Sequence, residues 1–271
     1  MILFVFEGKV REPRIYKTVR ALFFEDAVLD DILVSYCSNI YSLYRQMKSL
    51  DVFEGNDSDI VRLLKQEAER HPEITNTLEQ FENSDTFSEI YLFFDYDIKR
   101  LDTKNRESVE TQNEHIREML AFFNDETGNG KLYINYPMVE SIRYFRNSLP
   151  DEYFHTYTTD LFIGKKFKQL ADNDSVYKNL DFIAFKMNKT TLELRTVTEA
   201  EKQAVKKNWD MLKEASVKKA HYICKGSNTV PPEKAVIKQA SIFAGQLEKY
   251  VENQKISILN GFPLFLYEYF V

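Results

Sequence analysis

The stretch from Glu89 to Asp97 constrains the fold of this chain more than any other part of the sequence. It reads Glu-Ile-Tyr-Leu-Phe-Phe-Asp-Tyr-Asp, and the five consecutive residues 90–94 are all apolar or aromatic. Such a run is typical of a strand that is buried on both faces of a parallel sheet, because an amphipathic helix needs greater length and a polar stripe. The sequence therefore predicts a central strand whose end carries Asp95 and Asp97.

Two carboxylates stand close together at the end of this predicted strand. Two like charges ~4 Å apart repel by about 4 kcal/mol at an effective dielectric constant of ~20. A divalent cation reverses the sign of that interaction, and Mg²⁺ is commonly held by one or two carboxylates together with water. An isolated Asp-x-Asp is equally compatible with a solvated turn after a strand. A second acidic strand end, at the beginning of the chain, favours the metal site.

That second strand end follows the short apolar run at residues 2–6, which stops at Glu7 and a glycine. A helical spacing of apolar residues comes next, and Pro13 stands where a first helical turn tolerates its missing N–H. Strand, acidic loop and helix form half of a β-α-β unit. Ligands of open parallel sheets bind beyond the carboxyl ends of the strands. If the two apolar strands are neighbours, Glu7, Asp95 and Asp97 converge on one site.

The order of these motifs resembles the TOPRIM fold of topoisomerases, DnaG-type primases and OLD-type nucleases. The segment Phe-Glu-Gly-Lys-Val-Arg-Glu-Pro, with its second glutamate at Glu12, is similar to the TOPRIM proteins of bacterial abortive-infection systems, including the RloB-like and OLD-related groups. Residues 136–142 resemble the Asn-Pro-x-x-Glu segment of RloB-like proteins, although Tyr136 replaces the asparagine. The resemblance covers about residues 1–145.

The resemblance implies a nuclease that hydrolyses phosphodiester bonds of DNA or RNA with Mg²⁺ or Mn²⁺. In that case Asp95 and Asp97 bind a metal ion. Glu7 is a ligand of the same or a second metal ion, or a general acid/base, and Glu12 completes the second site. Glu140 is either a metal ligand or a group that supports the ligands. The alternative is that it only complements the helix dipole, as a glutamate in a first helical turn does.

Basic side chains near the predicted site are candidates for binding a phosphodiester. The resemblance implies that Arg14 and Lys17 stabilise the developing phosphoryl charge. The polar loop after Asp97 contains four more basic residues, which are available for phosphates or belong to a plain solvated loop: Lys99, Arg100, Lys104 and Arg106. A separate basic group consists of Lys165, Lys166 and Lys168.

The length of 271 residues allows one large domain or two modest ones. Glycine and proline are scarce, at 8 and 7 residues, so we expect helices rather than long linkers. The predicted fold class is α/β, with a TOPRIM-like, mostly parallel sheet flanked by helices in residues 1–148 and a mainly helical region, packed on it, in residues 149–271. The tail at 256–270 is too apolar to be exposed, so it packs back on the sheet or forms a partner surface.

Cysteine content and hydropathy predict a cytoplasmic protein that does not enter a membrane. Cys37 and Cys224 are far apart and lack a metal-binding spacing, which favours a reduced intracellular chain. No apolar stretch approaches the ~18 residues that indicate a membrane span. The first residues lack the basic region and cleavage site of a signal peptide and fit a strand of the fold.

Net charge bears on the partners. The formal net charge is −6, whereas proteins that bind nucleic acid unaided usually carry an excess of positive charge. The chain also lacks a Walker-type glycine loop, so we expect no ATPase activity in this polypeptide. Two hypotheses follow: a nuclease with nucleic acid as its substrate, or a regulatory module with a residual TOPRIM-like site that partners a separately encoded ATPase.

Overall fold

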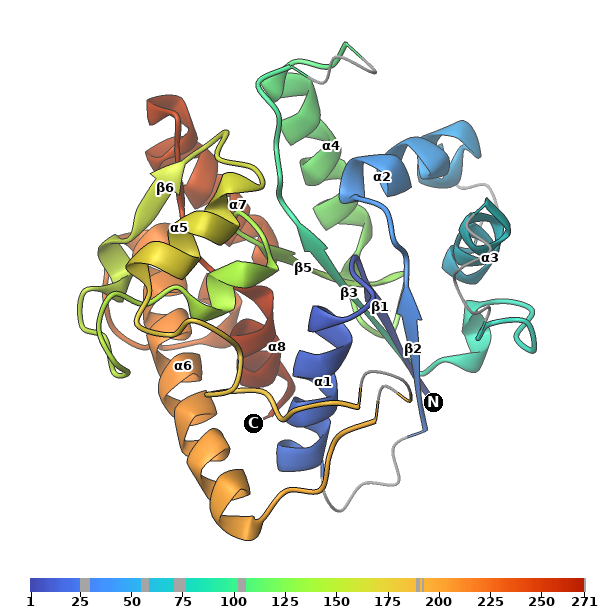
Figure 1. Cartoon of the computed structure of the whole chain (residues 1–271). Helices are drawn as coiled ribbons and strands as arrows, with labels where there is room; N and C mark the ends of the chain where they lie inside the picture. Colours follow the sequence, from blue (N-terminus) through green and yellow to red (C-terminus); the bar gives the residue numbers. More distant parts are fainter. Residues whose placement is uncertain are drawn as a thin grey trace. The chain divides into compact units, whose positions relative to one another are not determined.

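The computed structural model describes residues 1–24, 30–54, 59–70, 77–101, 106–188, 191 and 193–270. The chain divides into two compact units (Figure 1). Unit 1 comprises residues 1–13, 27–95 and 101–133, and unit 2 comprises residues 14–26, 96–100 and 134–271. The main boundary between these units lies after residue 133 and not after residue 148, and two short segments from the first half of the chain also belong to unit 2.

The chain forms a five-stranded, mostly parallel sheet in the order β2-β1-β3-β5-β4. The strands are β1 (Ile2–Phe6), β2 (Asp31–Ser35), β3 (Glu89–Asp95), β4 (Asn124–Asp125) and β5 (Gly130–Asn135). Strand β1 pairs in parallel with both β2 and β3, and the short β4 pairs with β5 in the antiparallel sense. The predicted α/β class with a mostly parallel sheet is therefore confirmed.

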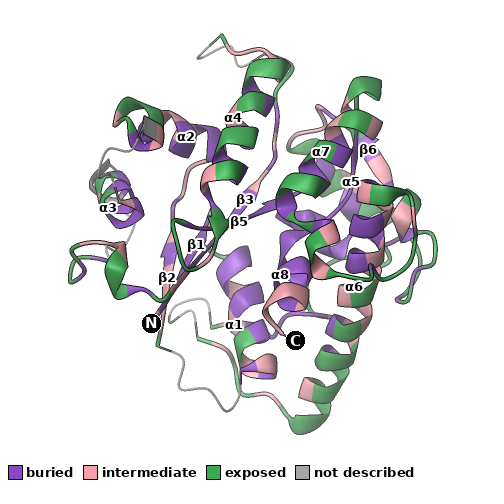
Figure 2. Cartoon of the chain, turned by 180° about the vertical axis from the view of Figure 1, so that it is seen from behind, coloured by how far each residue is buried: buried purple, intermediate pink, exposed green. Residues whose placement is uncertain are grey.

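The two central strands are buried along their whole apolar runs, as Figure 2 shows. Their register places Phe6 beside Phe93 and Phe4 beside Tyr91, with ring centroids 5.6 and 5.3 Å apart. Aromatic pairs at such distances add to the stabilisation that burial of apolar area provides. The continuous apolar sequence of each strand thus reflects cover on both faces.

Helices α2 (Ile40–Ser49), α3 (Ile60–Arg70) and α4 (Val109–Phe122) lie on one side of the strands of unit 1 (Figures 1 and 2). Asn39 caps α2 by accepting the Ser42 N–H at 2.9 Å. Tyr44 of α2 stacks on His115 of α4 at 3.9 Å between ring centroids. Short 3₁₀ turns η1 (Val52–Glu54) and η2 (Ser84–Thr86) complete this unit.

Helix α1 (Arg11–Phe23) follows β1, as the position of Pro13 predicts. Unit 2 contains α5 (Lys166–Asp174), α6 (Glu199–Lys225), α7 (Gln239–Lys249) and α8 (Gly261–Tyr269). Its antiparallel strands are β6 (Thr158–Asp160) and β7 (Lys255–Ser257), and its 3₁₀ turns are η3 (Val139–Arg143), η4 (Phe154–Thr156), η5 (Lys234–Ile237) and η6 (Val251–Asn253).

The long helix α6 has well-defined ends and a buried anchor. Thr198 and Glu201 form a reciprocal capping box at its start, and Gly226 ends it in the left-handed region at φ 76°. The fully buried Trp209 donates its Nε1–H to the Ile183 carbonyl at 2.7 Å. Helix α6 therefore forms part of the core of unit 2 in spite of its many charges.

The apolar C-terminal tail belongs to the core of unit 2. Its residues 256–266 are buried, and Leu259 exchanges two backbone hydrogen bonds with Tyr136, of 2.7 and 3.0 Å. Asn260 donates its side-chain amide to the Val139 carbonyl at 3.2 Å. These contacts leave the buried part of the tail unavailable as a partner surface. Within the described ranges, no helix combines the length and the apolar character that crossing a membrane requires.

Candidate active site

The two acidic strand ends of unit 1 lie side by side. The Glu7 N–H donates to the Phe93 carbonyl at 3.0 Å, which continues the parallel pairing of β1 and β3 by one residue. The carboxylate of Glu7 in turn accepts the backbone N–H of Asp95 at 2.9 Å. The predicted neighbourhood of the two strands is confirmed, because Glu7 and Asp95 occupy the same carboxyl edge of the sheet. Both residues are half-buried.

Glu12 closes the loop between β1 and α1. Its side chain is buried, and its Oε1 accepts the Gly8 N–H at 3.1 Å. A Cβ atom on Gly8 would lie 2.6 Å from Oε2 of the same carboxylate, so only glycine fits this close approach without a shift of the glutamate. Glu12 therefore holds the loop that carries Glu7. Its role in a second metal site stays a prediction.

Cys37, two residues after the end of strand β2, supports Glu7. It adopts the left-handed conformation at φ 61°, and its N–H donates to the Glu7 carbonyl at 3.0 Å. A non-glycine residue in this region of the backbone is uncommon and marks a local constraint. Sequence reasoning missed this contact, because no residue pattern indicates a positive φ at a cysteine.

Asp97 belongs to unit 2, where it follows the fully buried Tyr96. The Tyr96 and Asp97 N–H groups donate to the carbonyls of Asn135 and Pro137 at 3.0 and 3.1 Å. Burial raises the pKa of the Asp97 carboxyl group, although the ammonium groups of three lysines act to lower it: Lys99, Lys165 and Lys168. The structure thus places a half-buried carboxylate among lysines.

Glu140 is the second acidic group of this part of unit 2. It lies in the 3₁₀ turn η3 and not in the first turn of an α-helix, and only 2% of its surface is exposed. Its Oε1 is 3.3 Å from the Lys168 ammonium. Because Lys168 also acts to lower the pKa of Asp97, its charge is favourable for both carboxylates.

The structure gives Arg14 a role different from the predicted phosphate contact. Its guanidinium donates to the carbonyls of Phe185 and Ala184 at 2.8 and 2.7 Å and pairs with Asp181 at 2.8 Å. These three acceptors hold the group in a structural network within unit 2. Lys17 is half-buried on the same helix, and its contact with phosphate stays a prediction.

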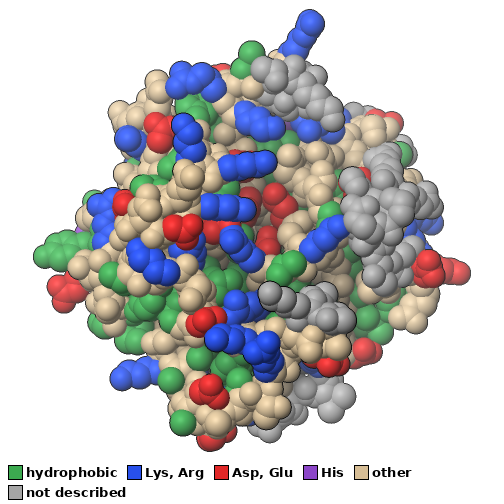
Figure 3. Space-filling view, in the orientation of Figure 1, with side chains coloured by type: hydrophobic (Ala, Val, Ile, Leu, Met, Phe, Trp, Pro, Cys, Tyr) green, Lys and Arg blue, Asp and Glu red, His purple; other side chains and the backbone are tan. Residues whose placement is uncertain are grey.

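The lysines that act on the Asp97 carboxylate come from the two other basic clusters. Lys99 and Arg100 are exposed directly after Asp97, while Lys104 lies outside the described residues. Lys165 and Lys168 are exposed at the beginning of α5. Figure 3 shows that Lys and Arg side chains are interspersed with Asp and Glu on the face it presents. The local lysine group is therefore a better candidate for phosphate than a general basic surface.

The donor chemistry suits a hard divalent cation that keeps several water ligands. Carboxylate oxygens are the ligands that Mg²⁺ prefers, and one or two of them are sufficient in many sites. Among the residues that the structure describes, no group of three or more His, Cys, Asp or Glu side chains is arranged to hold a metal ion. The Glu7 and Asp95 pair thus fits an open, water-rich site and does not form a closed protein cage.

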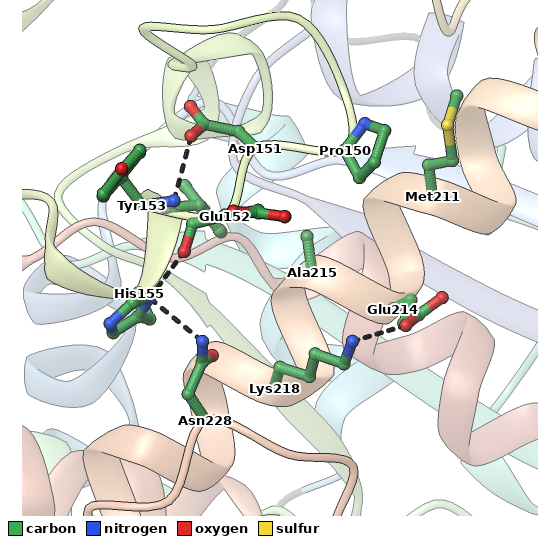
Figure 4. Close-up of a pocket in the computed structure, with 11 residues that line it drawn as sticks. Pro150, Asp151, Glu152, Tyr153, His155, Met211, Glu214, Ala215, Lys218 and Asn228 are labelled. Carbon is green, nitrogen blue, oxygen red and sulfur yellow. Dashed lines mark hydrogen bonds and ion pairs between the residues drawn. The ribbon is translucent and has the colours of Figure 1, made fainter.

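A cavity of about 620 Å³ lies elsewhere in unit 2, between α6 and residues 150–155 (Figure 4). Its polar groups are largely paired with one another: Asp151 accepts the Tyr153 N–H at 3.1 Å, and Lys218 pairs with Glu214 at 2.6 Å. Asp97 and Glu140 do not line it. The cavity has the size of a ligand site, but no reactive group in it stands out.

Comparisons with family models, with curated proteins and with solved structures found no match for this chain, so its own geometry carries the functional argument.

Proposed function

We propose that this chain is a nuclease that hydrolyses phosphodiester bonds of DNA or RNA with Mg²⁺ or Mn²⁺. The observation that carries the proposal is the hydrogen bond from the Asp95 N–H to the Glu7 carboxylate, at the carboxyl edge of two parallel buried strands. This is the edge where ligands of such sheets bind. The resemblance to TOPRIM proteins of abortive-infection systems adds a setting in bacterial defence against phages, and the cysteine content favours a cytoplasmic location.

The acidic residues have distinct tasks in this proposal. Glu7 and Asp95 would hold the cation together with water ligands, and metal roles for Asp97 and Glu140 stay predictions. A bound divalent cation polarises the scissile phosphate and lowers the pKa of a water ligand. Glu7 also lies in a position to accept a proton from the attacking water, since its carboxylate is held at the strand edge by a backbone N–H.

Lysines complete the proposed chemistry. Hydrolysis builds up negative charge on the phosphoryl oxygens, and fixed cations near those oxygens lower the barrier. Lys168, which pairs with Glu140, and Lys165 provide such charge within unit 2. These two lysines are further candidates for the task that the resemblance implies for Arg14 and Lys17.

The proposal is tested by a cleavage assay with single- and double-stranded DNA and RNA, in Mg²⁺ or Mn²⁺ and in EDTA. We expect cleavage that depends on the cation and falls at least about 100-fold in Asp95→Asn, the loss typical of removing one group that stabilises developing charge. The matched control is Glu79→Gln, a carboxylate-to-amide change at an exposed position. Equal activity of wild type and Asp95→Asn, or no cleavage of any substrate, would contradict the proposal.

A regulatory module is the second candidate function. In this hypothesis the TOPRIM-like site is residual, and the missing Walker-type loop and the net charge of −6 favour a separately encoded ATPase as the partner. The two candidates differ in their response to metal. A nuclease site should raise its melting temperature in millimolar Mg²⁺ or Mn²⁺ because it binds the cation only when folded. A residual site should show no such shift.

A further inference from the structure

The segment before helix α5 packs beside the acidic strand exit of unit 2. Gly164 adopts the left-handed conformation at φ 50°, and a Cβ atom at this position would lie 3.8 Å from Oδ1 of Asp97. The turn that leads into this glycine is fixed by Asp160, whose Oδ1 accepts the Phe162 N–H at 2.8 Å. Gly164 therefore lies close to the Asp97 carboxylate, at the end of a turn that a hydrogen bond fixes.

A cation–aromatic stack lies on this segment. The guanidinium carbon of Arg100 is 4.6 Å from the centroid of the Phe162 ring. Arg100 is exposed and Phe162 is half-buried, so the ring supports the guanidinium from the side of the protein. An arginine held in this way offers a flat cationic surface three residues after Asp97, and such planes stack on nucleobases.

Positive charge surrounds the same position. The ammonium groups of Lys99, Lys165 and Lys168 are close enough to Asp97 to act on its carboxylate. The Lys168 side chain is 51% exposed, although it pairs with Glu140. Phosphates on either side of a base bound at Arg100 would meet these lysines.

We propose that Arg100, positioned by Phe162, stacks on a nucleobase and thereby selects single-stranded nucleic acid, while Lys165 and Lys168 bind the phosphates that flank this base. This inference rests on the proposed nuclease function and names its substrate class. The physical reason is that a base in a duplex is covered by its neighbours on both faces. Only an unpaired base presents a free face to the guanidinium, so stacking on Arg100 discriminates between single-stranded and duplex nucleic acid. The lysines attract the phosphates of both.

The test measures binding separately from cleavage. Fluorescence anisotropy of the full chain is recorded with one labelled oligonucleotide, single-stranded or annealed to its complement, as DNA and as RNA, in EDTA. The informative variant is Arg100→Lys, which keeps the charge and removes the plane. We expect it to lower the affinity for the single strand about 5- to 100-fold, the range that stacking of one base contributes, and to leave duplex affinity within twofold.

Two further variants sharpen the result. Phe162→Ala should lower single-strand affinity in the same way, and Phe162→Tyr, which keeps a supporting ring, should restore it. The control Arg195→Lys makes the same exchange at an exposed arginine elsewhere in unit 2 and should change nothing. Wild-type affinity in Arg100→Lys, or an equal loss of affinity for single strand and duplex, would overturn the inference. Either result would show that the charge of residue 100, and not its planar group, accounts for binding.

The two assays together distinguish a failure of the proposed stacking site from a failure of the proposed nuclease function. Loss of strand preference in Arg100→Lys without any cleavage by wild type would support the stacking site and contradict the nuclease. Cation-dependent cleavage that is lost in Asp95→Asn, with no effect of Arg100→Lys on strand preference, would support the nuclease and contradict the stacking site. Arg100 is exposed, so its exchange to lysine leaves the core intact, and the melting temperature of the variant checks this.

Discussion

The backbone N–H of Asp95 donates to Oε2 of Glu7 at 2.9 Å, across 88 residues of sequence. One acidic strand end therefore positions the other, before any cation binds. Glu7 therefore has two roles that can be separated by mutation. Its oxygen accepts a hydrogen bond that contributes to the stability of the fold, and its negative charge is proposed to bind the cation that activity requires.

Substitutions of Glu7 separate these properties. Glu7→Gln keeps an acceptor oxygen for the Asp95 N–H, so we expect a free energy of unfolding close to wild type and at least a ~100-fold loss of cation-dependent cleavage. Glu7→Ala removes the acceptor as well and should cost about 1–2 kcal/mol of stability. Urea unfolding and the cleavage assay measure the two effects. Equal stability of both variants would show that the hydrogen bond does not contribute.

Asp97→Asn should stabilise the protein at neutral pH in EDTA. Burial raises the pKa of Asp97, so the folded chain retains this proton at pH values where the unfolded chain has lost it. The contribution of Asp97 to the free energy of unfolding is therefore fully present at low pH. It is lost as the pH rises from ~3.9, the pKa in the unfolded chain, through the raised pKa of the folded chain. We expect the variant to melt a few degrees above wild type at pH 7 and to converge with it below about pH 4. A constant difference across this range would contradict the assignment.

A divalent cation should stabilise the wild-type protein and should have little effect on the stability of Asp97→Asn. Binding to the folded state alone stabilises by about 2.7 kcal/mol at a concentration 100 times the dissociation constant. We therefore expect millimolar Mg²⁺ or Mn²⁺ to raise the melting temperature of wild type, EDTA to reverse the shift, and Asp97→Asn to show little of it. An undiminished metal response in the variant would exclude Asp97 as a ligand.

Lys219 makes stability depend on alkaline pH. It is fully buried and donates to the carbonyls of Phe154 and Tyr157 at 2.8 and 2.7 Å. Burial holds the pKa of Lys219 well below that of an ordinary lysine, although Asp151 acts to raise it. The unfolded chain thus binds this proton up to a higher pH than the folded chain, so the free energy of unfolding rises with pH until about 10.4.

Comparison with Lys219→Met isolates this effect, because methionine does not titrate. We expect the stability of wild type relative to the variant to increase between pH 7 and pH 10 in urea unfolding. Lys218→Met is the matched control at a neighbouring, partly exposed lysine, and its difference from wild type should be nearly independent of pH. A flat difference for Lys219→Met would show that its ammonium is not desolvated.

Gly245 permits the close contact between α6 and α7. A Cβ atom at this position would lie 2.6 Å from the Ile223 carbonyl oxygen, which belongs to the backbone and cannot rotate away. Gly245→Ala should therefore cost about 1–3 kcal/mol, as overpacking of a core does. Gly128→Ala is the control, since its Cβ would meet atoms only at 3.7 Å or beyond. Thermal unfolding of both variants provides the measurement, and equal stability would contradict the tight contact.

The sequence by itself determined the strands and their acidic ends. Residues 2–6 and 90–94 are uninterrupted apolar runs, and a run of this length without a polar stripe is stable only as a strand covered on both faces. The same logic placed Glu7 and Asp95 at one edge, since parallel strands end on the same side. These predictions depend only on the local composition and on the spacing of apolar residues, so they can be made without knowing which distant segments are in contact.

Only the tertiary structure decided which charged groups meet. Arg14 was predicted to bind phosphate from its place near the acidic loop, yet its guanidinium bonds to Phe185, 171 residues away along the chain. Lys168 was one of a cluster of lysines, and only the fold pairs it with Glu140. A long charged side chain on a helix surface can reach many partners, and its sequence neighbours do not state which segment folds against it. Burial and long-range packing decide which partner each side chain meets. For this reason Arg14 has a structural role, whereas Lys168 remains accessible to a substrate.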